Sequence, residues 1–311
     1  MMGSRPFSQW RATVPSLWRS VLLSLVSTYL RLTPLRYGAH RLMTYGARLL
    51  GPVPRVGVSR DGRKFLLQFP RDRGWERLYF ARTFETGTTE LLGRLLRPSD
   101  VTFDVGANIG WYTTLFAAQC PRGRCHAFEP EPEIFEELAR NCALNGIAER
   151  VKLNNLGLGA TGGATTIYRF AGVPHGHTSL SSQVGADARG VGCRITTVDE
   201  YCVQRGLKRV DLIKVDVEGA ELGVLQGAQS LLASGQSPIW VFEVNYLTSR
   251  AFGYAPPDLF RHLSEREAFR FFRVVQGGGR VLPMRSVSDC GQSDNVLCVP
   301  PAHQDRIAWL R

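Results

Sequence analysis

The run Val101–Gly110 constrains this chain more than any other segment. It reads VTFDVGANIG, a short apolar stretch followed by an acid and by two glycines around Ala107 and Asn108. A second apolar run, CHAF, follows and leads into Glu129. In parallel α/β sheets, glycines after the first strand let the backbone approach a nucleoside, and an acid after the second strand accepts hydrogen bonds from ribose hydroxyls. The pattern therefore predicts a site for a nucleoside cofactor.

The spacing of the glycines separates this loop from dinucleotide-binding loops. Gly106 and Gly110 do not form a G-x-G-x-x-G pattern, and Asp104 comes just before the first glycine. A pyrophosphate is bound by a glycine-rich helix N-terminus without a nearby carboxylate, so a nicotinamide dehydrogenase is disfavoured. A carboxylate suits a cation instead, and the sulfonium and amino groups of S-adenosylmethionine meet that requirement.

From residue 100 onward, predicted strands and helices alternate, which is typical of a parallel α/β sheet. A hairpin over 164–169 and 192–195 interrupts the alternation around the loop 171–190. The predicted strands are 101–105, 124–128, 151–155, 210–216, 238–244, 268–275 and 294–299, and the predicted helices are 109–119, 132–145, 196–206, 219–234 and 256–266.

Acidic residues follow several of these strands. Asp104, Glu129, Asp216 and Glu243 all stand at the C-terminal end of a predicted strand. Ligands of parallel α/β sheets bind at that edge of the sheet. We therefore expect the four acids to belong to one functional site.

Four segments together resemble the FkbM family of S-adenosylmethionine-dependent methyltransferases. They are DVGANIGWYT at 104–113, FEPEP at 128–132, N-x-x-x-N at 141–145 and IKVDVEGAE at 213–221. The resemblance covers about residues 100–300. It implies the Rossmann-like, seven-stranded sheet of class I methyltransferases, whose last strand is antiparallel. It also implies methyl transfer to a hydroxyl oxygen of a sugar, glycolipid or natural product.

The resemblance assigns the cofactor contacts residue by residue. Asp104 and the loop after it would hold the methionine end, and Glu129 would bind the ribose. Residues 155–158, after the third strand, would lie near the adenine. The implied cofactor-binding set is Asp104, Gly106, Ala107, Asn108, Gly110, Glu129, Pro130 and Leu158.

The acceptor hydroxyl needs a base or a metal ion, because a hydroxyl is a poor nucleophile. Lys214 and Asp216 are two residues apart in a strand and so share one face of the sheet. One hypothesis makes Asp216, or His175 or His177 of the loop 171–190, the general base. The other binds a divalent cation such as Mg²⁺ through Asp216 and Glu243, with Asn245 as a further ligand. The expected catalytic set is Asp216, Glu218, Glu243 and His177.

Each of these residues also has a purely structural interpretation. Glu218 and Glu221 could cap the next helix and stabilise its dipole. The acids could bind hydroxyls of an acceptor sugar without a metal. Histidines in a glycine-rich loop are often surface residues, and His126, inside a predicted strand, is expected in the core.

The positive charge is concentrated at the N-terminus. The chain carries a net charge of +11, yet its first 60 residues contain nine arginines and neither lysine nor an acid. Three interpretations remain open: a helical extension packed on the main domain, a helix lying on anionic lipid through Trp10, Trp18, Leu22, Leu25 and Leu30, or a targeting peptide. The apolar run Val21–Leu30 is too short for a transmembrane span, which needs about 20 apolar residues.

We therefore expect two parts. Residues 1–97 form a basic helical extension, with helices over 14–50 broken at Pro34 and a β-hairpin over 56–69 that turns at Asp61-Gly62. Residues 98–311 form the methyltransferase domain. Seven scattered cysteines without a C-x-x-C pair favour a reduced, cytoplasmic location, at the membrane surface if residues 1–60 contact lipid.

The function that fits best is an S-adenosylmethionine-dependent O-methyltransferase acting on a small-molecule or glycan acceptor. The arginines lie on apolar-periodic helices, a pattern that disfavours nucleic acid as a partner. The alternative is a non-catalytic Rossmann-like module that docks on membranes through its arginine-rich N-terminus.

Overall fold

The computed structural model describes residues 16–32, 39–51, 53–69, 71–72, 74–170, 178–179, 188–286 and 289–310. The chain divides into two compact units, Met1–Phe84 and Glu85–Arg311. The division falls before the expected boundary at residue 97, because helix α4 (Thr86–Leu95) packs against elements of the second unit. Leu91, Leu92 and Leu95 of α4 are buried there.

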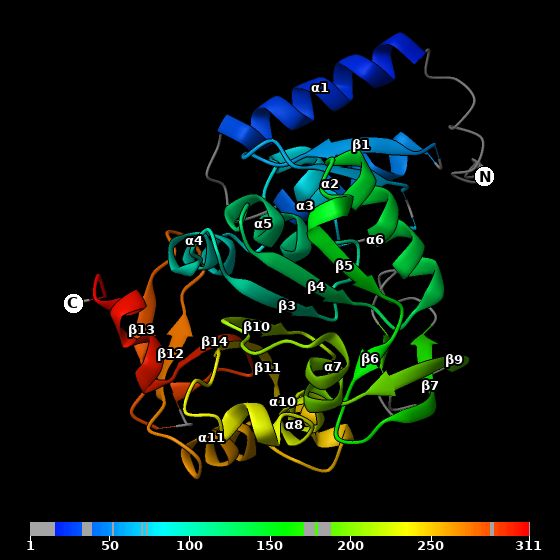
Figure 1. The fold of residues 1–311 in the computed structure, drawn as a ribbon. Coiled ribbons are helices and arrows are strands. Elements are labelled where there is room, and N and C mark those ends of the chain that lie inside the picture. The colour runs from blue at the N-terminus through cyan, green and yellow to red at the C-terminus, as the bar shows by residue number, and fades with distance from the viewer. Residues whose placement is uncertain are drawn as a thin grey trace, which may run out of the picture. The chain divides into compact units, whose positions relative to one another are not determined.

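The first unit combines helices with a β-hairpin (Figure 1). Its elements are α1 (Ser16–Leu32), α2 (Ala39–Leu50), β1 (Arg55–Val58), β2 (Lys64–Leu67) and α3 (Glu76–Ala81). β1 and β2 pair antiparallel, and Gly62 in the turn between them has a φ of 88°. The predicted hairpin and its turn are thus confirmed. Pro34, the expected helix break, lies outside the described residues.

The second unit is built on an eight-stranded sheet with the order β13-β12-β14-β11-β10-β3-β4-β5 (Figure 1). All seven predicted strands are present, and β14 runs antiparallel to both β11 and β12, as expected for the last strand. The strands are β3 (Val101–Val105), β4 (Arg124–Phe128), β5 (Val151–Asn154), β10 (Leu212–Val215), β11 (Ile239–Asn245), β12 (Arg270–Val274), β13 (Val281–Pro283) and β14 (Ser293–Val299).

The eighth strand, β13, was not predicted. It pairs with β12 at the sheet edge after a turn through Gly277, Gly278 and Gly279, all with positive φ. Glycine tolerates that conformation without a steric cost, so three in succession can reverse the chain. A three-residue strand is too short to show a periodic apolar pattern.

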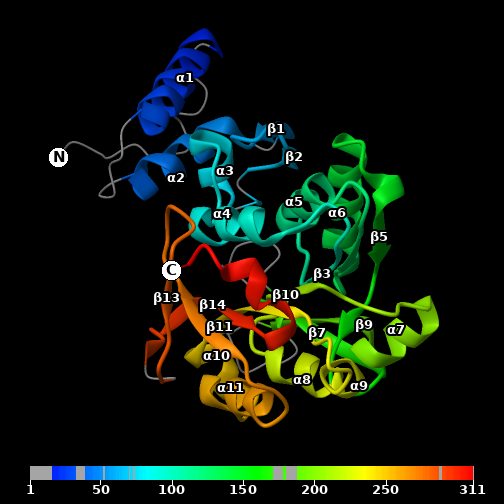
Figure 2. The same cartoon turned by 60° about the vertical axis from the view of Figure 1, so that its left-hand side comes forward.

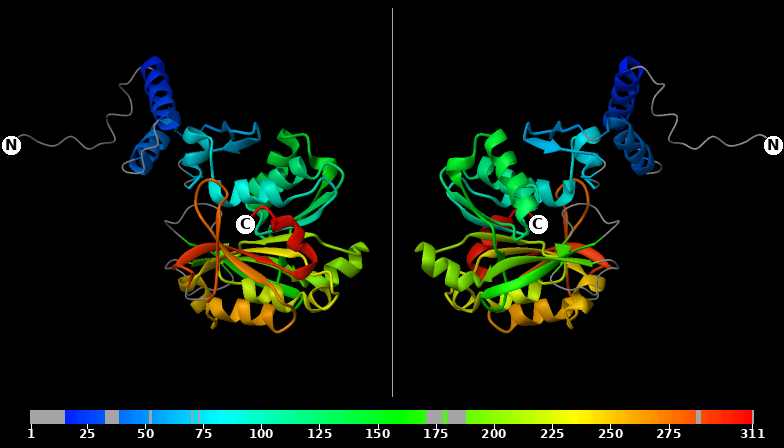
Figure 3. Two further views of the ribbon diagram at one scale, coloured as in Figure 1. Left: turned by 90° about the vertical axis from the view of Figure 1, so that its left-hand side faces the viewer. Right: turned by 90° about the vertical axis from the view of Figure 1, so that its right-hand side faces the viewer.

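Helices cover both faces of this sheet (Figures 2 and 3): α4, α5 and α6 lie on one face, and α8 to α11 lie on the other. The helix expected over 219–234 is two helices, because the chain turns at Gly227, where a Cβ atom would stand 2.1 Å from the carbonyl oxygen of Gly159. The helices are α5 (Trp111–Gln119), α6 (Pro132–Leu144), α7 (Val198–Arg205), α8 (Glu221–Gln226), α9 (Gln229–Leu232), α10 (Tyr246–Ala251) and α11 (Pro256–Ser264), with 3-10 turns η2 (Ala148–Arg150) and η5 (Pro301–Ile307).

A smaller sheet has the order β6-β9-β7-β8. β7 (Gly163–Phe170) and β9 (Ala188–Thr196) form the predicted hairpin, longer than expected, and β6 (Gly157–Leu158) and β8 (Thr178–Ser179) pair at its edges. His175 and His177 lie outside the described residues, so their assigned roles stay predictions.

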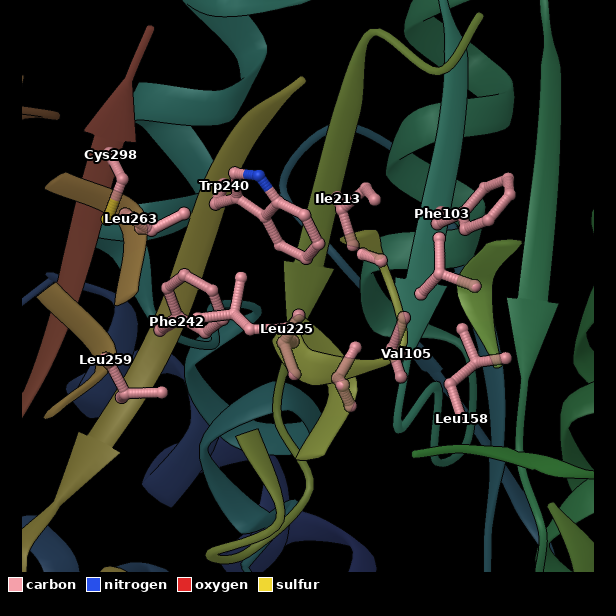
Figure 4. Packing of buried hydrophobic residues seen from close by; sticks show 14 of the residues in the cluster. Phe103, Val105, Leu158, Ile213, Leu225, Trp240, Phe242, Leu259, Leu263 and Cys298 are labelled. Atoms are coloured by element: carbon pink, nitrogen blue, oxygen red, sulfur yellow. The ribbon is translucent and has the colours of Figure 1, made fainter. Parts of the chain in front are cut away.

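The core of the second unit fills the space between the large sheet and its helices (Figure 4). Trp240 and Phe242, two residues apart on β11, stack with ring centroids 5.5 Å apart. Leu259 and Leu263 of α11 lie near them in the figure. Central parallel strands are buried on both faces and therefore read as continuous apolar runs. This packing fixes the strand ends, and with them the acids that follow.

Candidate functional site

The loop after β3 contains two glycines that the fold itself requires. Gly106 has a φ of 80°, and a Cβ atom there would stand 1.8 Å from the carbonyl oxygen of Asp216. Gly110 has a φ of 94°, and its Cβ would stand 2.7 Å from Leu138. Gly106 is thus needed where two strand-end loops touch, independently of any ligand. The contact joins the predicted cofactor loop to the predicted catalytic acid.

Hydrogen bonds hold this loop in one conformation. The backbone N–H groups of Gly106 and Ala107 both donate to the carbonyl oxygen of Phe128, at 3.0 and 2.9 Å. Asn108 has a φ of 49°, a left-handed conformation that asparagine tolerates better than most residues. Its side-chain oxygen accepts a hydrogen bond from Ile109 N at 2.8 Å. The loop is therefore ordered before any ligand binds.

Glu129 completes the predicted nucleoside site. Its Oε2 accepts a hydrogen bond from Asn108 N at 2.9 Å, and its Oε1 accepts one from Glu131 N at 3.0 Å. Burial raises the pKa of Glu129 to about 8, although both hydrogen bonds act in the opposite direction. Each carboxylate oxygen has a second acceptor position left for a ligand hydroxyl.

A hollow of about 400 Å³ lies beside this acid at the end of β5, and Pro130 and Asn155 line it. Asn155 Nδ2 donates to the carbonyl oxygen of Glu129 at 2.9 Å, so the hollow and the acid are held together. Leu158 is buried in the hydrophobic core, which leaves only its backbone for a nucleoside contact.

Asp104 is almost fully buried under the same loop, where Thr113 Oγ1 donates to its Oδ2. Burial raises its pKa to about 6. In the sheet register Asp104 is paired with Lys214 of the neighbouring strand β10. The two predicted halves of the site are therefore adjacent in the sheet.

Lys214 and Asp216 form an ion pair at the end of β10. Lys214 Nζ lies 3.1 Å from Asp216 Oδ2, and the lysine side chain is fully buried. Burial alone would disfavour its charge, yet the carboxylates of Asp216, Glu85 and Glu243 raise the pKa of Lys214 above its usual value. Its ammonium also lies 5.1 Å from the ring centroid of Tyr112.

Three carboxylates surround this ammonium. Glu85, Asp216 and Glu243 each place an oxygen within 4.8 Å of the others. The charge of Asp216, together with burial, raises the pKa of Glu243 to about 9. Burial also raises the pKa of Glu85, and Tyr112 Oη donates to Glu85 Oε2 at 2.5 Å. We call Glu85, Asp216 and Glu243 the acidic cluster.

Sequence reasoning missed Glu85. It precedes α4 in the N-cap position, with a φ of 38°, far along the chain from the segments that resemble a known family. The left-handed conformation of a glutamate cannot be predicted from the sequence, and no periodic pattern marks Glu85 as a site residue. Only the packing of α4 against α5 brings Glu85 to Tyr112 and the strand ends.

Three other residues considered from the sequence, Glu218, Glu221 and Asn245, lie in the turns after β10 and β11. Glu218 has a φ of 51°, and its charge contributes to the raised pKa of Glu243. Glu221 is buried and accepts hydrogen bonds from Gly219 N at 3.0 Å and Tyr254 Oη at 2.7 Å, so it holds the turn after β10. Asn245 Oδ1 caps α10 by accepting from Leu247 N at 2.9 Å, a use that competes with its expected role as a metal ligand.

Two further polar residues, His126 and Asn295, are buried in strands of the large sheet. His126 is buried in β4, with Nδ1 2.8 Å from Tyr201 Oη, which confirms the expected core histidine. Asn295 of β14 is paired with Glu243 in the sheet register, and its buried Oδ1 has no hydrogen-bond partner among the described residues. Asn295 therefore lies beside the acidic cluster.

With this geometry established, the family can be named. The family model of the methyltransferase FkbM domain matches residues 104–272, which include the loop, Glu129, Asp216 and Glu243. The chain belongs to the FkbM methyltransferase family. The match begins after Glu85, so the third member of the acidic cluster lies outside it.

Several methyltransferases are similar to part of this chain. Methyltransferase sdnD of Sordaria araneosa is 33% identical over 151 residues, which cover 40% of this chain and 58% of that protein. The 31-O-demethyl-FK506 methyltransferase FkbM of Streptomyces tacrolimicus is 28% identical, with 43% and 61% covered. The hexuronic acid methyltransferase AglP of Haloferax volcanii is 26% identical, with 58% and 68% covered. The alignments with the first two span less than two thirds of those proteins.

Proposed function

We propose that this protein is an S-adenosylmethionine-dependent methyltransferase that methylates a hydroxyl of a sugar, glycolipid or natural product. One observation carries the proposal: the cofactor loop and the acidic cluster meet at the contact between Gly106 and the Asp216 carbonyl. Two relatives, the 31-O-demethyl-FK506 methyltransferase and the hexuronic acid methyltransferase, are named for acceptors of these classes and support the proposal. Membership of a methyltransferase family favours this function over a non-catalytic module.

The chain offers suitable groups for each end of the cofactor. Glu129 has acceptor positions for ribose hydroxyls, and the hollow beside Pro130 and Asn155 suits the base. Asp104 supplies negative charge toward a sulfonium and an amino group. When bound, S-adenosylmethionine supplies an electrophilic methyl group, which passes from its sulfur to the acceptor oxygen.

Asp216 is the proposed proton acceptor for the hydroxyl. It is the carboxylate bound to Lys214, and its side chain is about one third exposed, so an acceptor can reach it. Glu85 and Glu243 each place a carboxyl oxygen within 4.8 Å of its own, and Asp216 in turn raises the pKa of Glu243 to about 9. Positioning of the two reacting atoms supplies much of the remaining rate in a displacement of this kind. Lys214 keeps the carboxylates oriented while the proton moves.

The same three oxygens could ligate a divalent cation such as Mg²⁺, which prefers carboxylates. A metal would orient the hydroxyl and lower its pKa. The buried ammonium of Lys214 already lies 3.1 Å from Asp216 as a cation. This ion pair favours a proton acceptor over a metal site.

Titration calorimetry with S-adenosylmethionine tests the cofactor assignment. We expect binding with a 1:1 stoichiometry, and the same for the demethylated product. Transfer of a labelled methyl group to a panel of hexoses, hexuronic acids and hydroxylated macrolides then tests the acceptor class. Absence of any binding heat at high micromolar cofactor would sink the proposal.

The pH profile separates a proton acceptor from a metal site. Because Asp216 raises the pKa of Glu243 to about 9, Glu243 is protonated below that pH and adds its negative charge beside Asp216 only above it. We expect kcat/KM to rise with pH up to about 9, and Glu243→Gln to remove this limb or move it to lower pH. Treatment with EDTA should leave the rate unchanged. Loss of activity with EDTA and its recovery with Mg²⁺ would assign the cluster to a metal instead.

A further inference from the structure

Helix α1 carries an apolar stripe that faces solvent. Its large exposed side chains are three or four residues apart, the spacing that places residues on one side of a helix. Trp18 is 66% exposed and Leu25 is 62% exposed. The stripe consists of Trp18, Val21, Leu22, Leu25 and Tyr29. We call these five residues the α1 stripe.

A different side of α1 attaches the helix to the first unit. Leu23, Val26 and Leu30 are partly buried, and Ser27 Oγ donates to the carbonyl oxygen of Phe80 at 3.2 Å. The expectation that Leu30 faces lipid is therefore wrong, and Trp10 lies outside the described residues. α1 packs against α2 and α3 through this side. The α1 stripe is therefore not needed to hold the helix in place. Contiguous exposed apolar residues of this size are typical of an interaction surface.

The charge of the N-terminal segment indicates what the stripe binds. The first 60 residues contain nine arginines and no acid or lysine. On α2, Arg41, Tyr45 and Arg48 are exposed at helical spacing, and the Arg48 guanidinium lies 5.6 Å from the Tyr45 ring centroid. Basic residues beside tryptophan, tyrosine and leucine are the composition of helices that lie on anionic lipid.

The length of α1 indicates whether this helix lies on a bilayer surface or spans the bilayer. Among the residues that the structure describes, none of the helices is both long and apolar enough to span a membrane. α1 has 17 residues and includes Ser24, Ser27 and Thr28. Tryptophan and tyrosine in the stripe suit the headgroup level, where an apolar ring and a polar edge are both accommodated.

We infer that α1 docks this protein on the surface of an anionic lipid bilayer, with the α1 stripe in the headgroup boundary and the neighbouring arginines on lipid phosphates. This surface lies in the first unit, outside the FkbM domain match, and is independent of the methyl transfer. Apolar burial and electrostatic attraction contribute together, as in other peripheral helices. Binding should therefore depend on lipid charge, on salt and on the stripe.

Vesicle sedimentation of the full-length protein tests this inference. We expect pelleting with vesicles of phosphatidylcholine and phosphatidylglycerol, and little with phosphatidylcholine alone. The double variant Leu22→Ser/Leu25→Ser should bind vesicles at least roughly tenfold more weakly, because the apolar contact of two leucines with the bilayer is lost. Arg41→Gln/Arg48→Gln should weaken binding more at about 0.1 M salt than at about 0.5 M salt.

The matched control is Val203→Ser/Leu247→Ser, which removes two exposed apolar side chains of the second unit. It should pellet like the wild type, and all variants should keep the wild-type melting temperature and cofactor binding. Equal pelleting of the α1 variant and the wild type would overturn the inference. So would a concentration-dependent dimer that the α1 variant abolishes without any vesicle binding, because it would assign the stripe to a second copy.

Discussion

Glu129 and the acidic cluster are two buried acidic regions, and their carboxyl groups have different kinds of partner. Glu129 receives a backbone N–H on each oxygen and lies in a loop whose own hydrogen bonds are complete. Glu85, Asp216 and Glu243 instead lie together, with Lys214 as their shared ammonium. The first arrangement is ready to accept ligand hydroxyls without rearranging. The second favours uptake of a proton, because like charges at short range oppose ionisation.

This contrast assigns affinity to one region and chemistry to the other. Changes at Glu129 should act on cofactor binding, and changes in the acidic cluster should act on turnover. Because Gly106 connects the two regions through backbone alone, side-chain variants on either side can test them separately.

The largest effect is expected from Asp216→Asn. An amide cannot accept the proton, so turnover should fall by at least about a thousandfold, within the range of general-base effects. The cofactor dissociation constant should change by less than about twofold, since Glu129 keeps its contacts. Steady-state kinetics and calorimetry measure the two quantities, with the exposed Glu136→Gln as control. Loss of cofactor binding in Asp216→Asn would contradict the assignment of turnover to the acidic cluster and of cofactor affinity to Glu129.

Lys214→Met removes the cation of the cluster. The variant leaves three carboxylates without their ammonium, and breaking a buried ion pair costs about 3–5 kcal/mol of unfolding free energy. The deficit should be smallest well below pH 4.5, the ordinary pKa of Glu85 and Glu243, and should grow as pH rises because ionisation of these two carboxyls is then opposed in the folded state alone. Urea unfolding at several pH values measures it, with the exposed Lys152→Met as control. A deficit independent of pH would indicate lost packing alone.

Glu129→Gln tests the other region. The amide nitrogen cannot accept a hydrogen bond, so one backbone N–H, of Asn108 or Glu131, loses its acceptor. We expect roughly ten- to hundredfold weaker cofactor binding, because a buried donor left without an acceptor costs about 1–3 kcal/mol. At saturating cofactor kcat should stay nearly unchanged. The exposed Glu133→Gln serves as control, and a fall in kcat with unchanged affinity would contradict the assignment.

The smallest effect is expected from Tyr112→Phe. It removes the hydroxyl that donates to Glu85 and keeps the ring beside Lys214. A lost hydrogen bond of about 0.5–1.5 kcal/mol lowers kcat about two- to tenfold. A double-mutant cycle with Glu85→Gln measures the coupling between the two side chains. Additive effects would show that Glu85 acts without Tyr112.

Local patterns were sufficient for most of the fold. The seven main strands and the hairpin over β7 and β9 follow from apolar runs bounded by glycine, proline and acids. The helix expected over 219–234 was wrong as one element, because the backbone of Gly159 stands against Gly227. The strand β13 and the division before α4 also depend on partners distant in the chain.

The sequence by itself determined that acids stand at or near the ends of parallel strands, beside a glycine-containing loop. Glu129 and Asp216 follow a strand and Glu243 lies near the end of β11, and strand ends gather at one edge of such a sheet. Only the tertiary structure decided that Glu85 joins them, that Gly106 is needed for a contact between loops, and that α1 leaves an apolar stripe exposed. The physical reason is that periodicity records which face of an element is apolar. The whole fold sets which distant residue packs against that face.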